Sequence, residues 1–302
     1  MIQLTPQLKR PPHPIVWGDR TYIMGILNAT PDSFSGDGIS SDLTQTQLID
    51  RAIAQAVNFV DAGADVLDIG GESTRPNSET IDGQIERSRI LDVIREVRKA
   101  LPQTVISVDT YRAKTAEVAL AAGADWINDI WGFKHDSDIA GVAAVADCPV
   151  VLMHNGRNRR RLQQDDGAGG YYGYFEYESL IEDVLIECQE SIDIALDAGV
   201  QEGNIMIDPG IGFGKTAPQN IELMSSLARF KTLGYPILLG TSRKGFIGQY
   251  LGGLPVDERV EGTIATCVLG IAAGVDILRV HDVQAVARAT RMADVIVRSE
   301  VK

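Results

Sequence analysis

Residues 61–70 read Asp-Ala-Gly-Ala-Asp-Val-Leu-Asp-Ile-Gly, and this phrase returns along the chain. Residues 121–130 read Ala-Ala-Gly-Ala-Asp-Trp-Ile-Asn-Asp-Ile, and residues 272–280 read Ala-Ala-Gly-Val-Asp-Ile-Leu-Arg-Val. A looser copy spans residues 198–207. Each copy follows a segment of helical periodicity, has a Gly where a helix end favours a left-handed residue, and runs into a short apolar strand. The phrase therefore marks a repeated helix–turn–strand unit.

The spacing of these units predicts the fold class. Short strands rich in Val, Ile and Leu are expected at about residues 21–28, 66–70, 104–109, 126–130, 149–153, 205–208, 236–240 and 276–280. Helical patterns fall at about residues 42–62, 84–100, 112–122, 176–198, 217–233, 257–273 and 282–299, with a further candidate at 137–146. Eight buried strands that alternate with helices favour an α/β fold, a (β/α)8 TIM barrel. A doubly wound open sheet is the alternative, weakened by the lack of G-x-G-x-x-G after the first strand.

We expect an N-terminal extension over residues 1–20, a single barrel domain over residues 21–302, and a long loop at about residues 155–177. The chain has 302 residues, 44% of them hydrophobic, which suits an ordinary globular protein without disulfides. Its net charge of −13 argues against nucleic acid as a partner, because phosphates attract a basic surface. The net charge does not argue against a small anionic ligand, since a few cations can reverse the field inside a cleft.

The three cysteines stand alone in apolar settings, at positions 148, 188 and 267, and are expected to be buried thiols in a reducing cytoplasm. The first twenty residues lack the apolar core of a signal peptide. The longest nearly apolar run, residues 264–275, is shorter than the roughly 20 residues that span a bilayer. We therefore expect a cytoplasmic protein with no membrane partner.

Polar residues follow every predicted strand, at the barrel end where active sites lie. Asp109, Asn128 and Asp208 are expected to meet there as acceptors and an amide, which suits a flat heterocycle with N–H donors. The alternative is a buried polar network that braces the barrel.

The last two strands supply the expected cationic side of the site, where barrels often bind phosphate: Lys244, Arg279 and His281. Asn28, after the first strand, can offer a neutral oxygen to a hard cation such as Mg2+. Residues 210–216 resemble a Walker A loop but are one residue short, and the four His have no zinc spacing. No nucleophile–base pair emerges, which points away from covalent catalysis.

Five motifs together resemble the dihydropteroate synthase family, in the family's order and spacing from about residue 20 to the C-terminus. They are Ile-Leu-Asn-Ala-Thr-Pro-Asp-Ser-Phe-Ser at 26–35, Asp-Ile-Gly-Gly-Glu-Ser-Thr-Arg-Pro at 68–76, Asp-Pro-Gly-Ile-Gly-Phe-Gly-Lys at 208–215, Thr-Ser-Arg-Lys-Gly at 241–245 and Arg-Val-His-Asp at 279–282. The resemblance implies a TIM barrel, usually a homodimer, in folate biosynthesis. It also implies transfer of a (7,8-dihydropterin-6-yl)methyl group from its diphosphate to 4-aminobenzoate, with Mg2+ as cofactor.

The resemblance also implies roles for single residues, position by position. The residues implied to bind pterin and diphosphate are Asn28, Thr74, Asp109, Asn128, Met153, Asp208, Phe213, Lys244, Arg279 and His281. Those implied to bind 4-aminobenzoate, where sulfonamide drugs compete in the family, are Phe34, Thr74, Arg75, Pro76, Phe213, Ser242 and Lys244. The implied catalytic group is Asn28, Lys244, Arg279 and His281, with Asn28 also near the metal.

Because an arylamine is neutral and nucleophilic at pH 7, we expect the barrier to lie in the loss of diphosphate. Stabilising the charge that grows on this leaving group favours a dissociative substitution. Three alternatives are a non-catalytic pterin-binding paralogue, a methyltransferase on the same barrel, and a barrel aldolase with a Schiff-base Lys. The Ser-Thr-Arg-Pro loop at residues 73–76 weighs against the first two, and the setting of Lys244 weighs against the third.

Overall fold

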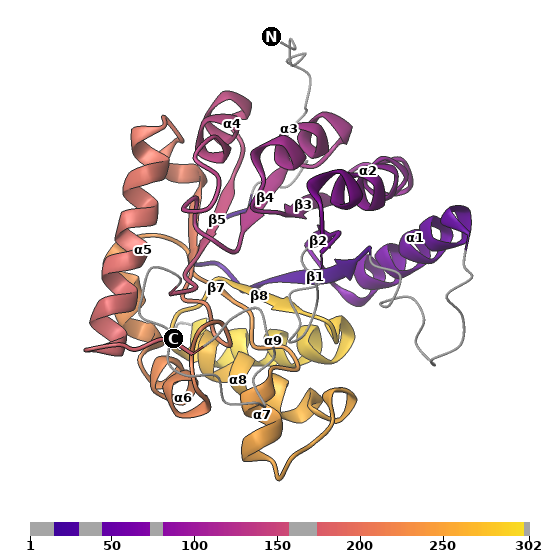
Figure 1. Cartoon of the computed structure of the whole chain (residues 1–302). Coiled ribbons are helices and arrows are strands. Elements are labelled where there is room, and N and C mark those ends of the chain that lie inside the picture. Colours follow the sequence, from indigo (N-terminus) through magenta and orange to yellow (C-terminus); the bar gives the residue numbers. More distant parts are fainter. Residues whose placement is uncertain (1–14, 30–43, 73–80, 157–173, 299–302) are drawn as a thin grey trace.

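The computed structural model describes residues 15–29, 44–72, 81–156 and 174–298. Within these ranges the chain forms a ring of parallel strands with helices around it (Figure 1). The strands are β1 (Tyr22–Asn28), β2 (Val66–Gly70), β3 (Val105–Asp109), β4 (Trp126–Asp129), β5 (Val150–Met153), β6 (Ile205–Asp208), β7 (Leu238–Leu239) and β8 (Ile277–Val280). The expected extension and long loop fall largely outside the described residues, and the domain boundaries stay predictions.

The helices lie close to the predicted ranges. They are α1 (Gln45–Ala62), α2 (Gly83–Ala100), α3 (Ala113–Ala122), α4 (Ile139–Ala146), α5 (Leu180–Asp197), α6 (Ala217–Ser225), α7 (Gly245–Tyr250), α8 (Val260–Ala272) and α9 (Val283–Arg298), with 3-10 turns η2 (Glu202–Asn204), η3 (Leu227–Leu233) and η4 (Val256–Glu258). The Gly of each repeated phrase is left-handed, with φ of +107°, +120° and +91° at Gly63, Gly123 and Gly274. These glycines end the preceding helices as the repeat predicts.

Two details of the helix prediction were wrong. The helix predicted over residues 217–233 ends at Ser225 and continues as the 3-10 helix η3. The Ser225 hydroxyl donates to the carbonyl of Glu222 at 2.8 Å, and this local bond competes with the α-helical ladder. The short helix α7, which follows Lys244, was not predicted.

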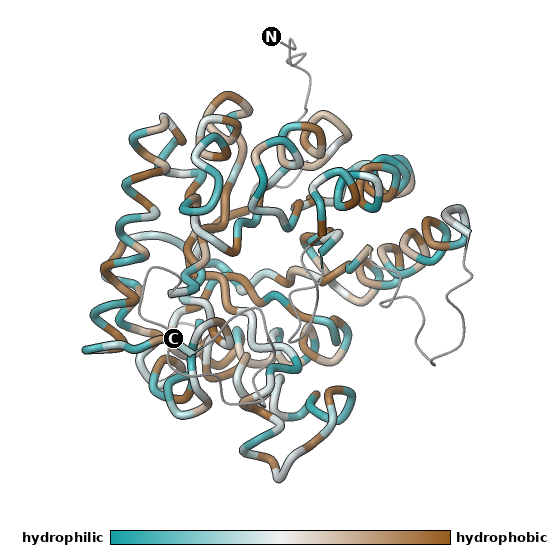
Figure 2. The backbone as a smooth tube through the Cα atoms, viewed as in Figure 1, coloured by the Kyte–Doolittle hydropathy of each residue, from teal (hydrophilic) through white to brown (hydrophobic). Residues whose placement is uncertain are grey.

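The outward faces of the strands pack against the helices. Residues in alternate positions, such as Leu67 and Ile69 of β2, belong to one core cluster with buried side chains of the surrounding helices. The hydropathy colouring shows brown, apolar positions along the central strands and on the inner sides of the helices (Figure 2). Gly25 faces outward on β1, and a Cβ there would lie 2.8 Å from the ring of Phe59 on α1. Glycine thus lets α1 approach the strand closely.

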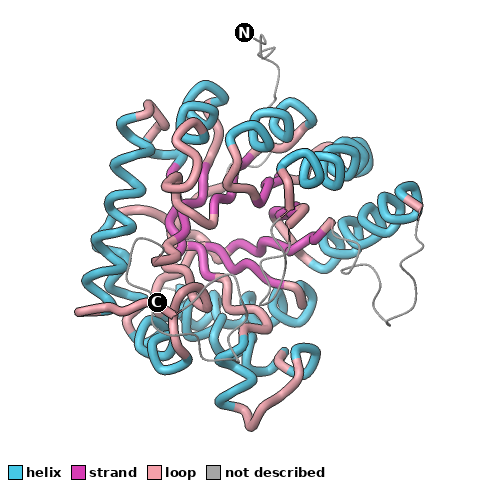
Figure 3. Tube along the Cα trace, viewed as in Figure 1, coloured by secondary structure: helices cyan, strands magenta, loops and turns pink. Residues whose placement is uncertain are grey.

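The sheet closes into a barrel between β6 and β7, the first and last strands of its hydrogen-bonded order. The strand order is β6-β5-β4-β3-β2-β1-β8-β7, and a parallel bridge between Ile207 and Ile237 joins β6 to the segment before β7 (Figure 3). The inward residues nearest the strand starts form an apolar floor: Tyr22, Met24, Val66, Val105, Trp126, Val151, Met206, Leu238 and Ile277. The TIM barrel prediction is confirmed, and the floor closes one end of the barrel. No helix within the described ranges is long and apolar enough to cross a membrane.

Candidate active site

The period-two alternation of the strands places a polar layer directly above the apolar floor. Two residues beyond the floor residues, in the same inward phase, come Asp68, Ser107, Asn128, Met153, Asp208 and Arg279. Most of these side chains are buried, and Asp68 and Ser107 are 0% exposed. Asp109 and His281 follow two residues later on β3 and after β8, and Asn28 ends β1. The strands therefore bring the predicted residues from β1, β3, β4, β5, β6 and β8 into one barrel mouth.

Arg279 lies at the centre of this layer and binds two carboxylates. Its Nε donates to Asp68 Oδ2 at 2.6 Å, and its Nη2 donates to Asp109 Oδ2 at 2.6 Å. Asn128 Nδ2 donates to the same Asp68 oxygen at 3.0 Å. The expected cationic side of the site thus binds the expected acceptor side, through Arg279 Nε and Nη2. Neither of these two bonds uses Nη1.

The charges in this cluster shift one another. Burial alone would lower the pKa of Arg279, but the fields of Asp68 and Asp109 outweigh it and raise that pKa. The pKa of Asp109 is raised to about 7, because burial disfavours its charge more than Arg279 stabilises it and Asp68 repels it. Arg279 is therefore a cation, while burial and the nearby Asp68 make the Asp109 carboxylate easier to protonate than an exposed one.

Lys244 and Phe213 lie against each other at the barrel mouth. The Lys244 ammonium lies 3.9 Å from the centroid of the Phe213 ring, a cation–π contact. Burial lowers the pKa of Lys244 to about 8, against the attraction of Asp208 and Asp109. A Cβ on Gly212 would lie 2.7 Å from Lys244 Cδ, so glycine lets the lysine stem pass. Asp208 accepts from Gly210 N at 2.7 Å, and burial raises its pKa.

The side chains of the Ser-Arg-Lys motif at residues 242–244 contact different partners. The Ser242 hydroxyl lies 3.0 Å from His281 Nδ1 and accepts from the His281 backbone N–H at 3.1 Å. Arg243, with a left-handed φ of +58°, binds Asp282 through Nε at 2.9 Å. Arg243 therefore braces the loop after β8, and only Ser242 and Lys244 turn toward the predicted site.

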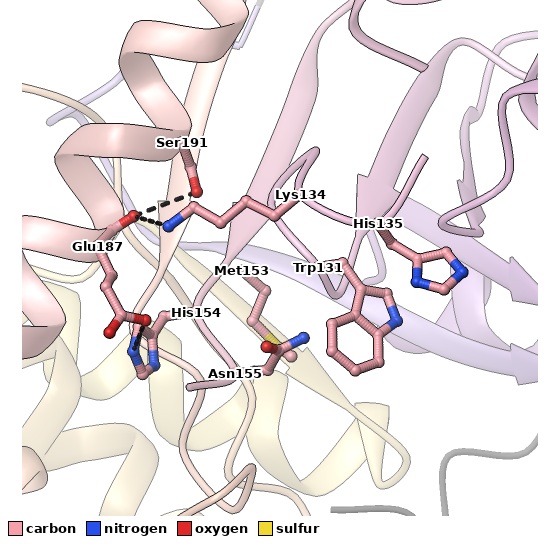
Figure 4. Close-up of a pocket in the computed structure, with 8 residues that line it drawn as sticks. All are labelled: Trp131, Lys134, His135, Met153, His154, Asn155, Glu187 and Ser191. Carbon is pink, nitrogen blue, oxygen red and sulfur yellow. Dashed lines mark hydrogen bonds and ion pairs between the residues drawn. The ribbon is translucent and has the colours of Figure 1, made fainter. Parts of the chain in front are cut away.

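Met153 belongs to an apolar cluster beside the polar layer, with Tyr111, Ile130, Trp131 and Phe213. Behind it, between the β4 and β5 ends and α5, lies the pocket in Figure 4, which Met153, Trp131 and Asn155 line together with His154 and Glu187. His154 Nε2 lies 3.1 Å from Glu187 Oε2. The predicted apolar lining at Met153 thus continues into aromatic side chains that a flat ring can stack on.

Asn28 is half-buried at the end of β1 and pairs in register with Gly70. Among the described residues, no group of three or more His, Cys, Asp or Glu side chains is arranged to hold a metal ion. A single amide oxygen fits Mg2+ only as one ligand of an ion that arrives with diphosphate oxygens and water. The donor set therefore suits a metal–diphosphate complex rather than a metal held by protein alone.

Four predicted residues lie outside the described ranges: Phe34, Thr74, Arg75 and Pro76. Conversely, the structure brings in Asp68, which the prediction quoted within a motif but gave no role. Its signal was a carboxylate inside the otherwise apolar strand Val-Leu-Asp-Ile-Gly, in the inward phase. Asp68 Oδ1 is buried without a hydrogen-bond partner among the described residues.

Comparisons with known proteins agree with this geometry. The family model of pterin binding enzymes matches residues 24–281. The dihydropteroate synthase of Clostridium beijerinckii is 51% identical over 282 residues, which cover 93% of this chain and 96% of that protein. The crystal structure of dihydropteroate synthase from Clostridium difficile in the presence of pteroic acid has a TM-score of 0.83 and 45% identity, and covers 94% of this chain and 99% of that one. The Xanthomonas albilineans synthase with 4-aminobenzoic acid has a TM-score of 0.81 and 34% identity, over 92% of this chain and 93% of its own.

The family model places this α/β barrel among the pterin binding enzymes. The matches cover nearly the whole chain at high identity. The chain therefore belongs to the dihydropteroate synthase family of pterin binding enzymes.

Proposed function

We propose that the chain joins (7,8-dihydropterin-6-yl)methyl diphosphate to 4-aminobenzoate and releases 7,8-dihydropteroate and diphosphate. The observation that carries this proposal is the polar layer with Asp68, Asn128, Asp208 and Arg279 above a closed apolar floor, together with Asp109 at the end of β3. It combines acceptors for ring N–H groups with a fixed cation for an anionic leaving group.

In this proposal the pterin ring lies between Asp109, Asn128 and Asp208 and packs on Met153 and Phe213. Carboxylates accept from the guanidine-like edge of the ring, and the Asn128 amide can both donate and accept. Lys244, held against Phe213, donates to an acceptor of the ring. Because hydrogen bonds within the barrel already hold Asn128 and Asp208 in place, these groups lose little conformational freedom when they bind the ring.

We assign the diphosphate to Arg279 Nη1, His281 and Asn28. Arg279 is already aligned by Asp68 and Asp109, so it meets the leaving group without reorganising. Mg2+ is the cofactor we propose, with Asn28 as one ligand, and when bound it supplies positive charge to the phosphate oxygens. The chain's own residues hold the diphosphate against the same barrel wall that binds the ring.

The proposed reaction is a dissociative substitution. The bond between the methylene carbon and the diphosphate oxygen breaks, and its electron pair leaves with the diphosphate. The amine lone pair of 4-aminobenzoate then forms the C–N bond, and the surplus proton passes to solvent. Asp208 and its neighbours support positive charge on the pterin while the methylene carbon is electron-poor. The second substrate site, with Phe34, Thr74, Arg75, Pro76 and Ser242, completes the proposal, as does competition there by sulfonamides.

A homodimer in the cytoplasm is also proposed. Its support is a group of apolar side chains that α8 and α9 expose by 61–66%: Leu269, Met292, Val295 and Ile296. The cytoplasmic setting is supported by three free, buried cysteines, whose thiol pKa burial raises to about 12. Light scattering of the wild type and of Ile296→Asp tests the dimer, and a wild-type monomer would refute it.

Purified protein with both substrates and Mg2+ tests the reaction. We expect release of diphosphate and formation of 7,8-dihydropteroate in equal amounts. Tight pterin binding without turnover would reject the synthase and favour a binding paralogue. A covalent adduct between pterin and a side chain, isolated after quenching, would contradict the dissociative route.

A further inference from the structure

Lys215 is a buried lysine that the proposed reaction does not use. It is only 3% exposed, at the end of the turn that follows β6. Its Nζ donates to the carbonyls of Gly210 at 3.0 Å and Phe213 at 3.1 Å, and lies 3.0 Å from His154 Nδ1. Burial lowers the pKa of Lys215 to about 7. In the protonated form its three N–H donors match these three partners, with His154 Nδ1 as an acceptor.

His154 connects this ammonium to helix α5. If Nδ1 accepts from Lys215, the proton of the neutral ring lies on Nε2, which faces Glu187 Oε2 at 3.1 Å (Figure 4). Burial, with the positive charge of Lys215, lowers the pKa of His154 to about 3, so the ring is neutral. The side chains thus lie in a row from Lys215 to the neutral His154 ring and on to Glu187 of α5, whose carboxylate is 3.1 Å from Nε2 but outside hydrogen-bond geometry.

The turn over residues 209–214 is wound tightly around Lys215. Gly210, Gly212 and Gly214 have φ of +71°, +81° and +64°, in the left-handed region. A Cβ on Gly210 would clash with the carbonyl of His154, and one on Gly214 would lie 2.6 Å from the carbonyl of Asn155. The turn therefore lies directly on the end of β5, and two of its carbonyls bind the ammonium.

The same turn supports two residues of the proposed pterin site. Gly210 N donates to Asp208 Oδ1 at 2.7 Å and so orients that carboxylate. The turn also carries Phe213, whose ring lies against the Lys244 ammonium at 3.9 Å. Lys215 contacts the carbonyls of both Gly210 and Phe213 and so links the backbone at these two points.

We propose that Lys215 is a positioning residue that shapes the 209–214 turn around its ammonium and thereby places the Asp208 carboxylate and the Phe213 ring for the pterin. His154 and Glu187 hold the lysine in turn. This inference rests on the proposed function, because it takes a pterin to be the ligand of the site. Lys215 itself touches neither substrate.

Separate binding of the two halves of the substrate tests this role. In Lys215→Met, calorimetry should show that affinity for 6-hydroxymethyl-7,8-dihydropterin falls about tenfold or more, because two ligands lose their alignment. Affinity for inorganic diphosphate with Mg2+ should change less than about twofold, since Asn28 ends β1, Arg279 is held by Asp68 and Asp109, and His281 lies beside Ser242. A loss that is general to the fold would lower both affinities together.

Lys134→Met is the matched control. Lys134 borders the same pocket, and its ammonium binds the Glu187 carbonyl and the Glu190 carboxylate, both at 2.8 Å, but not the turn. Both affinities should stay within about twofold of the wild type in this variant. Unchanged pterin affinity in Lys215→Met, or an equal loss of both ligands, would overturn the inference.

Should Lys215→Met fail to fold, Glu187→Gln provides the second variant. It preserves the shape of the side chain but removes the charge at the end of the chain of contacts, and a selective fall in pterin affinity of about threefold is expected. Equal affinities in Glu187→Gln and the wild type would count against the role. A wild type that binds pterin without turnover would refute the proposed reaction while leaving this test intact.

Discussion

Replacing Asp68 with Asn should destabilise the barrel strongly, although it exchanges only one heavy atom. Asp68 is 0% exposed and accepts from Arg279 Nε at 2.6 Å and Asn128 Nδ2 at 3.0 Å. Removing one partner of a buried ion pair costs about 3–5 kcal/mol, because the other charge stays buried. Asp109 still binds Arg279, and its pKa should fall once Asp68 no longer repels it. We therefore expect the lower end, about 3 kcal/mol, or about 5 °C in Tm for a chain of this length.

Urea unfolding of single and double variants measures this quantity. In Asp68→Asn with Arg279→Gln, the loss should be smaller than the sum of the single losses by about 2 kcal/mol, because neither charge is left alone. Asp92→Asn is the control, since Asp92 binds Arg95 at 2.9 Å with side chains 48% and 51% exposed. That exposed pair should contribute about 0–1 kcal/mol. A loss for Asp68→Asn no larger than for Asp92→Asn would refute the reasoning.

Three further outcomes are expected. Lys244→Ala should weaken binding of the pterin diphosphate about tenfold or more, because a buried cation beside Asp208 is lost; unchanged affinity by calorimetry would contradict its placement. Arg75→Ala should reduce turnover more than pterin affinity, since its loop is expected to serve the second substrate, and equal losses would deny that division. For His154 the folded pKa is lowered to about 3, so its stabilisation is complete above the unfolded value of about 6.5 and is lost as pH falls toward 3. Between pH 7 and pH 5 the wild type should lose about 2 kcal/mol more than His154→Gln in urea unfolding, and parallel losses would disprove the shift.

The barrel could be predicted because its signal is local and repeated. Gly63, Gly123 and Gly274 each end a helix and precede an apolar strand, and a left-handed glycine followed by a buried strand has few other structural solutions. The helix over residues 217–233 shows where local periodicity fails. Its apolar spacing continues past Ser225, but the serine hydroxyl binds the backbone and the chain tightens into a 3-10 helix.

The sequence predicts which residues belong to the candidate site, but not which of them bind each other. The alternation along a strand shows that Asp109 and Arg279 point inward, yet strand register and barrel closure decide that they meet at 2.6 Å. Asp68 was missed because a single inward carboxylate within a strand has no pattern of its own. Lys215 lay within a quoted motif, but its contact with His154 joins positions 61 residues apart, which no local spacing reveals.

The ion pairs of Arg279 with Asp68 and Asp109 affect the charge that the site offers to an anion. The acidic net charge of −13 suggested that a few cations at the strand ends must attract the diphosphate. Arg279 is instead neutralised by Asp68 and Asp109, so the unliganded mouth presents little excess positive charge. Asp109, with a pKa near 7, can accept a proton or a ring N–H bond when a ligand competes for Arg279. In the proposed arrangement Asp68 and Asp109 keep the guanidinium in place through Nε and Nη2, and Nη1 meets the diphosphate. The proposed ring site and the proposed diphosphate site therefore share one arginine.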